Sequence, residues 1–188
     1  QVNKNDTIDS RQFVKVGRTT PQHMGGFNIS SSFKGIRLYA GFDYAFGFVI
    51  LNNYMVRGLS QVQGSQNATT DVLNTWSPTN PNGTMPRYYW ANQGRNYATD
   101  ASGNNPAANL WEKGDYVSLR ELTLAYDLSS QILNKYLGGR IKGLSVNITG
   151  TNLAYFSGYS GNFPEVGGVD QGKFPLPKRL TIGARVTL

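Results

Sequence analysis

Apolar and polar residues alternate along several stretches of this chain. The clearest case is the end of the sequence, where the apolar positions are Leu180, Ile182, Ala184, Val186 and Leu188. Such a period of two places one set of side chains on each face of a β-strand. The same pattern predicts an all-β protein with antiparallel strands near residues 24–33, 36–49, 115–128, 144–153 and 179–188.

The strand predicted at 115–128 changes phase in its middle. Val117 and Leu119 share one phase, whereas Leu122, Leu124 and Tyr126 share the other. One extra residue in a strand moves the following side chains to the opposite face. We therefore expect a β-bulge near residues 120–121.

The predicted connections alternate between short and long. Lys34-Gly35 is a hairpin turn, and residues 129–143 are short enough for a helical turn or two over 131–137. The long connections are 1–22, 52–114 and 155–178. Two-faced strands joined alternately by short turns and long loops are typical of an outer-membrane β-barrel. The long loops would then all be extracellular, and the short turns periplasmic.

Five strands cannot close a membrane barrel by themselves, because single-chain bacterial barrels begin at eight strands. The predicted strands therefore belong to a larger barrel, if the membrane interpretation holds. On such strands the polar phase faces the lumen or a plug, and the apolar phase faces lipid. The expected lumen-facing residues are Arg37, Asp43 and Arg185, and the expected lipid-facing residues are Leu180, Ile182, Val186 and Leu188. Phe33, Tyr155 and Phe156 suit the aromatic girdles at the membrane surfaces.

Composition excludes several function classes. The chain has 188 residues with no cysteine and a single histidine, His23, so disulfides, thiol catalysis, cysteine-ligated zinc and multi-histidine metal sites are excluded. The net charge of +7 is spread along the chain, and the only adjacent basic pair is Lys178-Arg179. A nucleic-acid interface would require a basic cluster interleaved with aromatic residues. We therefore expect no nucleic-acid partner.

No catalytic residues, cofactor or metal site are predicted, because no catalytic constellation is present in the sequence. The best candidates for binding are aromatic residues of the long segment, which lie among Asn, Gln and Arg and could contact a substrate or a partner protein. These candidates are Trp76, Tyr88, Tyr89, Trp90, Tyr97 and Trp111. Alternatively, they pack the loop itself or contribute to an aromatic girdle.

Five motifs, which occur in the family's order, resemble SusC/RagA-like transporters, which are TonB-dependent outer-membrane proteins of Bacteroidetes. Residues 115–128 resemble the family strand "YLRLKNLTLGYTLP", and residues 146–153 resemble "VYVSGQNLFT". Residues 169–179 are similar to the loop "GVDxGxYPxPR" before the final strand. Pro21 with Gly25-Gly26-Phe27 matches "PxxxGGF", and residues 76–81 match "WTPENP".

The resemblance implies that residues 1–188 are a C-terminal segment of a plugged barrel with about twenty-two strands, the plug domain being absent from this chain. It implies import of an oligosaccharide or oligopeptide across the bacterial outer membrane, powered through TonB and assisted by a SusD-like lid lipoprotein. The alternative is a non-transport, all-β glycan-binding surface module.

The resemblance also aligns residues 1–12 with a calcium-loop-like pattern, "DxNxDGxIDxxD". Gln1, Asn5 and Gln12 stand at expected Asp positions, and Asp6 stands where Gly is expected, so that Asp9 alone keeps its place. Calcium requires several carboxylate oxygens and a sharp turn. We therefore expect a plain extracellular loop and no bound metal.

Overall fold

The computed structural model describes residues 14–55, 69–83, 110–138 and 140–188. The chain divides into two compact units, and each is described by itself. The first unit comprises residues 1–21, 47–114 and 159–174, and the second comprises residues 22–46, 115–158 and 175–188. Four of the aromatic binding candidates lie outside the described residues, namely Tyr88, Tyr89, Trp90 and Tyr97. The segment 1–12, which aligns with a calcium-loop-like pattern, also lies outside them.

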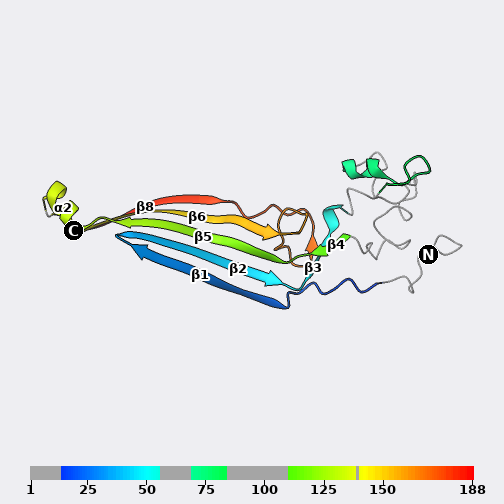
Figure 1. The fold of residues 1–188 in the computed structure, drawn as a ribbon, viewed down its shortest axis with the longest axis horizontal. Coiled ribbons are helices and arrows are strands. Elements are labelled where there is room, and N and C mark those ends of the chain that lie inside the picture. The colour runs from blue at the N-terminus through cyan, green and yellow to red at the C-terminus, as the bar shows by residue number, and fades with distance from the viewer. Residues whose placement is uncertain (1–13, 56–68, 84–109, 139) are drawn as a thin grey trace. The chain divides into compact units, whose positions relative to one another are not determined.

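The second unit is a five-stranded antiparallel sheet, which confirms the predicted all-β antiparallel architecture (Figure 1). Its strands are β1 (His23–Phe33), β2 (Ile36–Phe46), β5 (Tyr116–Asp127), β6 (Gly143–Ser157) and β8 (Arg179–Thr187). They are ordered β1-β2-β5-β6-β8, so sequential strands are neighbours. Strands β1 and β8 are the edges, and neither pairs with a further strand within the part of the chain that the structure describes.

Short connections join the strands at one end of this sheet. Lys34 and Gly35 both have positive φ, 47° and 85°, as a type I′ hairpin turn requires. Between β5 and β6 lies helix α2 (Ser130–Leu137), whose Ser129 side chain accepts a hydrogen bond from the Ile132 backbone N–H. Gly138 ends the helix in the left-handed conformation, with φ of 61°. We call this end of the sheet the turn end.

A bulge lies at the predicted place in β5. Leu119 pairs with Phe42 of β2 and Glu121 pairs with the preceding residue, Gly41, so Arg120 is the extra residue of the bulge. On the other side, the β5–β6 register shifts over the same interval, and Asn152 adopts a positive φ of 54°. The extra residue brings the two apolar phases of β5 onto one face.

The register therefore produces one apolar face across all five strands. Phe27 stacks on Phe42 with ring centroids 4.9 Å apart, and Ile148 lies between Leu124 and Ile182. The face is exposed in the structure; Ile182 is 78% exposed. The opposite face carries mainly Ser, Thr, Asn and charged side chains, including Asn28, Ser30, Thr123, Asn147 and Thr181. Among the described residues, no helix is long and apolar enough to span a membrane.

Two strand boundaries differ from the predictions by more than one residue. The strand expected at 36–49 ends at Phe46, because Gly47 turns the chain with φ of 78°. The next strand, β3 (Val49–Asn52), belongs to the first unit and lies between β4 (Trp111–Lys113) and β7 (Val169–Asp170). Strand β6 continues to Ser157, beyond the expected end at 153.

The first unit has its own small core. Strand β3 pairs antiparallel with β4 and parallel with β7, which places Ile50 and Leu51 in the centre. Ile50 has no exposed surface, and Phe48, Leu110, Phe163 and Val166 are also buried. The unit also contains a short 3₁₀ helix, η2 (Thr70–Asn74). A prediction of plain loops for 52–114 and 155–178 thus missed these elements, because the strands are too short for an alternation to be recognised.

Substitution of Gly35 tests the hairpin that connects β1 and β2. A Cβ atom on Gly35 would lie 2.7 Å from the carbonyl oxygen of Asp127. The positive φ of Gly35 is also unfavourable for any residue that has a side chain. We expect Gly35→Ala to lower the free energy of unfolding by at least about 1–2 kcal/mol, as measured by urea denaturation of the folded receptor. Gly158→Ala is the matched control, because nothing lies within 4 Å of its Cβ position. Equal stability of the two variants would contradict this role of Gly35.

Candidate functional site

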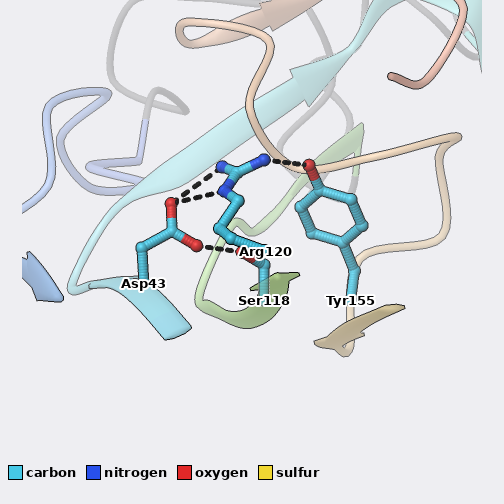
Figure 2. A network of polar contacts seen from close by, with 4 residues as sticks. All are labelled: Asp43, Ser118, Arg120 and Tyr155. Atoms are coloured by element: carbon cyan, nitrogen blue, oxygen red, sulfur yellow. Dashed lines mark hydrogen bonds and ion pairs between the residues drawn. The ribbon is translucent and has the colours of Figure 1, made fainter. Parts of the chain in front are cut away.

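The polar face of the five-stranded sheet carries a cluster of four side chains from three strands (Figure 2). Two nitrogens of Arg120, Nε and Nη2, each lie 2.8 Å from Asp43 Oδ2. The remaining terminal nitrogen, Nη1, donates to the Tyr155 hydroxyl at 2.8 Å. Ser118 Oγ donates to the other carboxylate oxygen of Asp43. The bulge thus aims Arg120 at the polar face, where it connects β2, β5 and β6.

The Arg120–Asp43 pair is partly withdrawn from water, and Ser118 beneath it is 1% exposed. The side chains of Arg120 and Asp43 are 27% and 32% exposed. Charge-assisted hydrogen bonds of this kind are stronger than neutral ones and hold their partners in fixed geometry. The cluster therefore stabilises the polar face, and its charges are mutually neutralised.

A second ion pair lies on the same face at the turn end. Arg37 Nε is 2.7 Å from Asp127 Oδ2, and its Nη2 donates to Ser145 Oγ at 3.3 Å. Arg185 stands opposite Ser145 in the β6–β8 ladder, and its side chain is exposed. A shallow hollow beside this pair is lined by hydroxyl, amide and guanidinium groups of Arg37, Thr123, Ser145, Asn147 and Arg185.

The sheet register places the predicted lumen-facing and lipid-facing residues on opposite faces. Arg37, Asp43 and Arg185 lie on the polar face. Leu180, Ile182 and Val186 lie on the apolar face, and Leu188 follows two positions after Val186. Which face meets a lumen and which meets lipid stays a prediction.

The girdle position expected for Tyr155 is wrong. Tyr155 pairs with Ser118, so it points to the polar face, and its hydroxyl binds Arg120. Phe156, its neighbour, lies on the apolar face and is 62% exposed. The sequence analysis also did not assign Ser118 and Arg120 to a site. The phase break at residue 120 was the available signal, because a bulged residue is free to point away from its neighbours' pattern.

The first unit contains a buried polar cluster around Asp170, which is 1% exposed. Its carboxylate accepts hydrogen bonds from the Tyr159 hydroxyl at 2.7 Å and from the Gly172 backbone N–H at 2.8 Å. Nearby, Glu112 accepts from Asn52 Nδ2 at 3.0 Å and from Ser160 Oγ at 2.7 Å. These bonds connect β3, β4 and β7 to the segment that follows β6.

Burial raises the pKa of Tyr159 well above its ordinary value of 10.0. The hydrogen bond to Asp170 and the negative charges of Asp170 and Glu112 act in the same direction, because an ionised phenol would be repelled by both carboxylates. Tyr159 therefore remains a neutral donor to Asp170. Within the described residues, no group of three or more His, Cys, Asp or Glu side chains is placed to hold a metal ion.

Two of the six aromatic binding candidates lie in the described part of the chain. Trp76 follows η2 and is 43% exposed. Trp111 is in β4, opposite Leu51, and is partly buried within the first unit. Tyr88, Tyr89, Trp90 and Tyr97 lie outside the described residues. A substrate or lid role for the six stays a prediction.

Removal of Arg120 should destabilise the sheet more than removal of Arg37. Arg120→Gln leaves the half-buried Asp43 without its charged partner, so we expect a loss of about 2 kcal/mol in the free energy of unfolding. Arg37→Gln is the control, because the Arg37–Asp127 pair is 56% and 44% exposed and should contribute less than about 1 kcal/mol. Urea denaturation of the two variants measures the difference between their free energies of unfolding. Equal losses would contradict the larger contribution of the Arg120–Asp43 pair.

The raised pKa of Tyr159 predicts an alkaline weakening of the first unit. The unfolded tyrosine ionises above about pH 10, whereas the folded one keeps its proton, so stability falls as pH rises above that value. The slope should approach about 1.4 kcal/mol per pH unit for this single group. Trp fluorescence during urea denaturation at pH 8 and pH 11 would measure it.

Tyr159→Phe should remove this part of the alkaline slope, although it also removes the hydrogen bond to Asp170. Tyr54→Phe is the control, because Tyr54 lies in the same unit and is 61% exposed. If both variants keep the slope of the unmodified protein, Tyr159 is not its source.

The chain is similar to TonB-dependent receptors over nearly its whole length. It is 28% identical over 95% of its length to TonB-dependent receptor P3 of Formosa agariphila, and 26% identical over 98% of its length to TonB-dependent receptor P26 of the same organism. The chain spans 18% and 19% of the lengths of these two relatives. No family model matches the chain.

Solved structures agree with these relatives. The RagAB peptide transporter matches 89% of the chain with a TM-score of 0.69 and 26% identity, and the match covers 17% of that protein chain. The RagAB peptide importer in its closed-closed state matches 99% of the chain with a TM-score of 0.74; at 23% identity this likeness concerns the fold. These findings bear out the resemblance to SusC/RagA-like TonB-dependent receptors that was predicted from the sequence, and they support the predicted place in the bacterial outer membrane.

Proposed function

We propose that this chain forms part of the wall of a TonB-dependent barrel that imports a large nutrient across the outer membrane. The observation that carries the proposal is the two-faced sheet in a chain that aligns over nearly its whole length with TonB-dependent receptors. About twenty-two strands would complete the barrel, and β1 and β8 would pair with strands contributed by the rest of the protein. The chain itself would perform no chemistry.

The dimensions of the sheet support a position in the membrane. Strand β2 has 11 residues, which extend about 36 Å at about 3.3 Å per residue. With the tilt of about 45° that is usual for membrane strands, this length spans about 25 Å. That is the height of the apolar band on outer-membrane barrels. Aromatic residues stand on the apolar face near both ends of this span, Phe33 at the turn end and Phe46 and Phe156 at the other.

The apolar face argues against the alternative of a soluble glycan-binding module. A sandwich buries the apolar face of each sheet against a second sheet. Here Leu180, Ile182 and Val186 are 67%, 78% and 52% exposed. Contact with lipid would remove this apolar surface from water, which would lower the free energy by about 25 cal/mol per Å² of buried surface.

The proposed substrate is an oligopeptide or an oligosaccharide. The likeness to the RagAB peptide transporter, at 26% identity, favours the oligopeptide. Trp76 and Trp111 suit either substrate, because indole rings pack on apolar faces of sugars and of side chains alike. The proposed partners are TonB, which would supply energy through a region outside this chain, and a SusD-like lipoprotein over the extracellular loops.

Uptake by living cells tests this function. A strain that lacks the receptor, and a second strain that lacks TonB, would be supplied with pools of fluorescently labelled oligopeptides or oligosaccharides. We expect both strains to lose uptake of one pool, and a plasmid copy of the receptor to restore it in the first strain. Unchanged uptake of both pools in the receptor-deficient strain would overturn the proposal.

Point variants then test whether Trp76, the more exposed of the two described aromatic candidates, contributes to uptake. If Trp76 contacts substrate, Trp76→Ala should raise the concentration for half-maximal uptake severalfold with little change in receptor abundance. Leu73→Ala is the control, because Leu73 is an 81% exposed apolar residue of the same segment. The same shift in both variants, or in neither, would remove Trp76 from the site.

A further inference from the structure

The turn end of the five-stranded sheet carries a group of basic residues that no part of the proposed transport uses. Lys34 lies in the β1–β2 turn, Lys135 lies on α2, and Arg140 and Lys142 follow that helix. All four side chains are exposed. We call Lys34, Lys135, Arg140 and Lys142 the turn-end rim.

The sheet register brings these residues to the same end. Ile36, directly after the hairpin turn, pairs with Tyr126 near the end of β5, and Asp127 pairs with Ser145 at the start of β6. The Asp127 backbone N–H donates to the Gly35 carbonyl at 2.8 Å, which ties the hairpin turn to the start of the α2 connection. Lys142 donates its backbone N–H to Thr187 at the end of β8.

Two lysines of the rim stand over exposed aromatic rings. Lys34 Nζ is 5.2 Å from the centroid of the Phe33 ring, and Lys135 Nζ is 5.3 Å from the centroid of the Tyr136 ring. Phe33 and Tyr136 are 69% and 72% exposed. An ammonium group beside a large uncovered ring combines an apolar surface with a cation, a combination suited to the boundary between acyl chains and headgroups.

The rim continues directly from the apolar face of the sheet. Phe33 is the last residue of β1 on that face and pairs with Ile36, which is 48% exposed. A ligand at this place therefore meets hydrocarbon-like side chains on one side and ammonium groups on the other. That order matches a lipid with an anionic headgroup.

The local charge supports the same ligand. In the described part of the sheet unit, six cationic side chains lie at the turn end, namely Lys34, Arg37, Lys135, Arg140, Lys142 and Arg185. The carboxylate of Asp127 is already engaged by Arg37. The rim therefore has an excess of positive charge, which attracts anionic lipid headgroups with a strength that grows with each lysine or arginine near the surface.

We propose that the turn-end rim binds the phosphate headgroup of an anionic phospholipid whose acyl chains lie against the apolar face beside Phe33. The rim lysines donate charge-assisted hydrogen bonds to the phosphate oxygens. An acidic protein would satisfy the charges but would leave the adjoining apolar residues uncovered, so the lipid fits both observations.

Native mass spectrometry of the whole purified receptor with added phosphatidylglycerol tests the proposal. We expect the unmodified receptor to retain this lipid in preference to phosphatidylcholine. The triple variant Lys34→Gln, Lys135→Gln, Lys142→Gln should bind phosphatidylglycerol at least about tenfold more weakly. The control triple variant Lys113→Gln, Lys173→Gln, Lys178→Gln makes the same change in net charge at lysines outside the rim, and it should bind as the unmodified receptor does.

Several outcomes would overturn the proposal. They are equal binding of the two lipids, equal binding by the two triple variants, displacement of phosphatidylglycerol by an equal concentration of inorganic phosphate, and binding of a polyglutamate peptide at the rim in place of the lipid. A heat-modifiability gel on each variant confirms that it is folded. Nutrient uptake is expected to continue in the rim variant, so failure of the lipid site would be distinguishable from failure of the transport function.

Discussion

A two-faced sheet keeps its faces chemically distinct only while every strand stays in phase, and in this protein the phase is maintained by the bulge at Arg120. Without the extra residue, Leu122, Leu124 and Tyr126 would turn to the polar face and Glu121 and Thr123 to the apolar one. The same bulge releases Arg120 from the ladder and directs it to Asp43 and Tyr155. One irregularity thus preserves the apolar face and creates the ion-pair cluster that connects β2, β5 and β6.

The second constraint is the satisfaction of backbone hydrogen bonds. Interior strands β2, β5 and β6 each have neighbours on both sides, whereas β1 and β8 are edges of the sheet that the described residues form. In hydrocarbon an unpaired backbone group costs several kcal/mol, so an open sheet cannot remain in a membrane. In the proposed barrel the edges therefore require further strands, which is consistent with a chain that spans less than a fifth of its curated relatives. Under the proposed function the apolar face would meet lipid, since the described residues leave it exposed.

Much of the sheet could be predicted from the sequence, because period-two alternation and turn chemistry are local signals. The hairpin at Lys34-Gly35, the bulge near residue 120 and the helix closed by Gly138 all have such signals. The first unit had none, since its strands are two to four residues long and are brought together by pairings far apart in sequence. Alternation continued past Gly47, so the turn there was missed. The buried Tyr159–Asp170 pair and the partners of Arg120 depend on such distant pairings, so the sequence could indicate the bulge at Arg120 but not these contacts.

Labelling of two adjacent positions on β8 tests the central claim most directly. Ile182→Cys lies on the apolar face opposite Ile148, and Thr181→Cys lies on the polar face opposite Thr149. The chain has no cysteine of its own, and the measurement would be made on the whole receptor, with any cysteine elsewhere replaced, in lipid vesicles. We expect a membrane-phase maleimide to label position 182 and a water-soluble maleimide to label position 181. Equal protection of both positions from the membrane-phase probe would contradict a lipid-facing sheet.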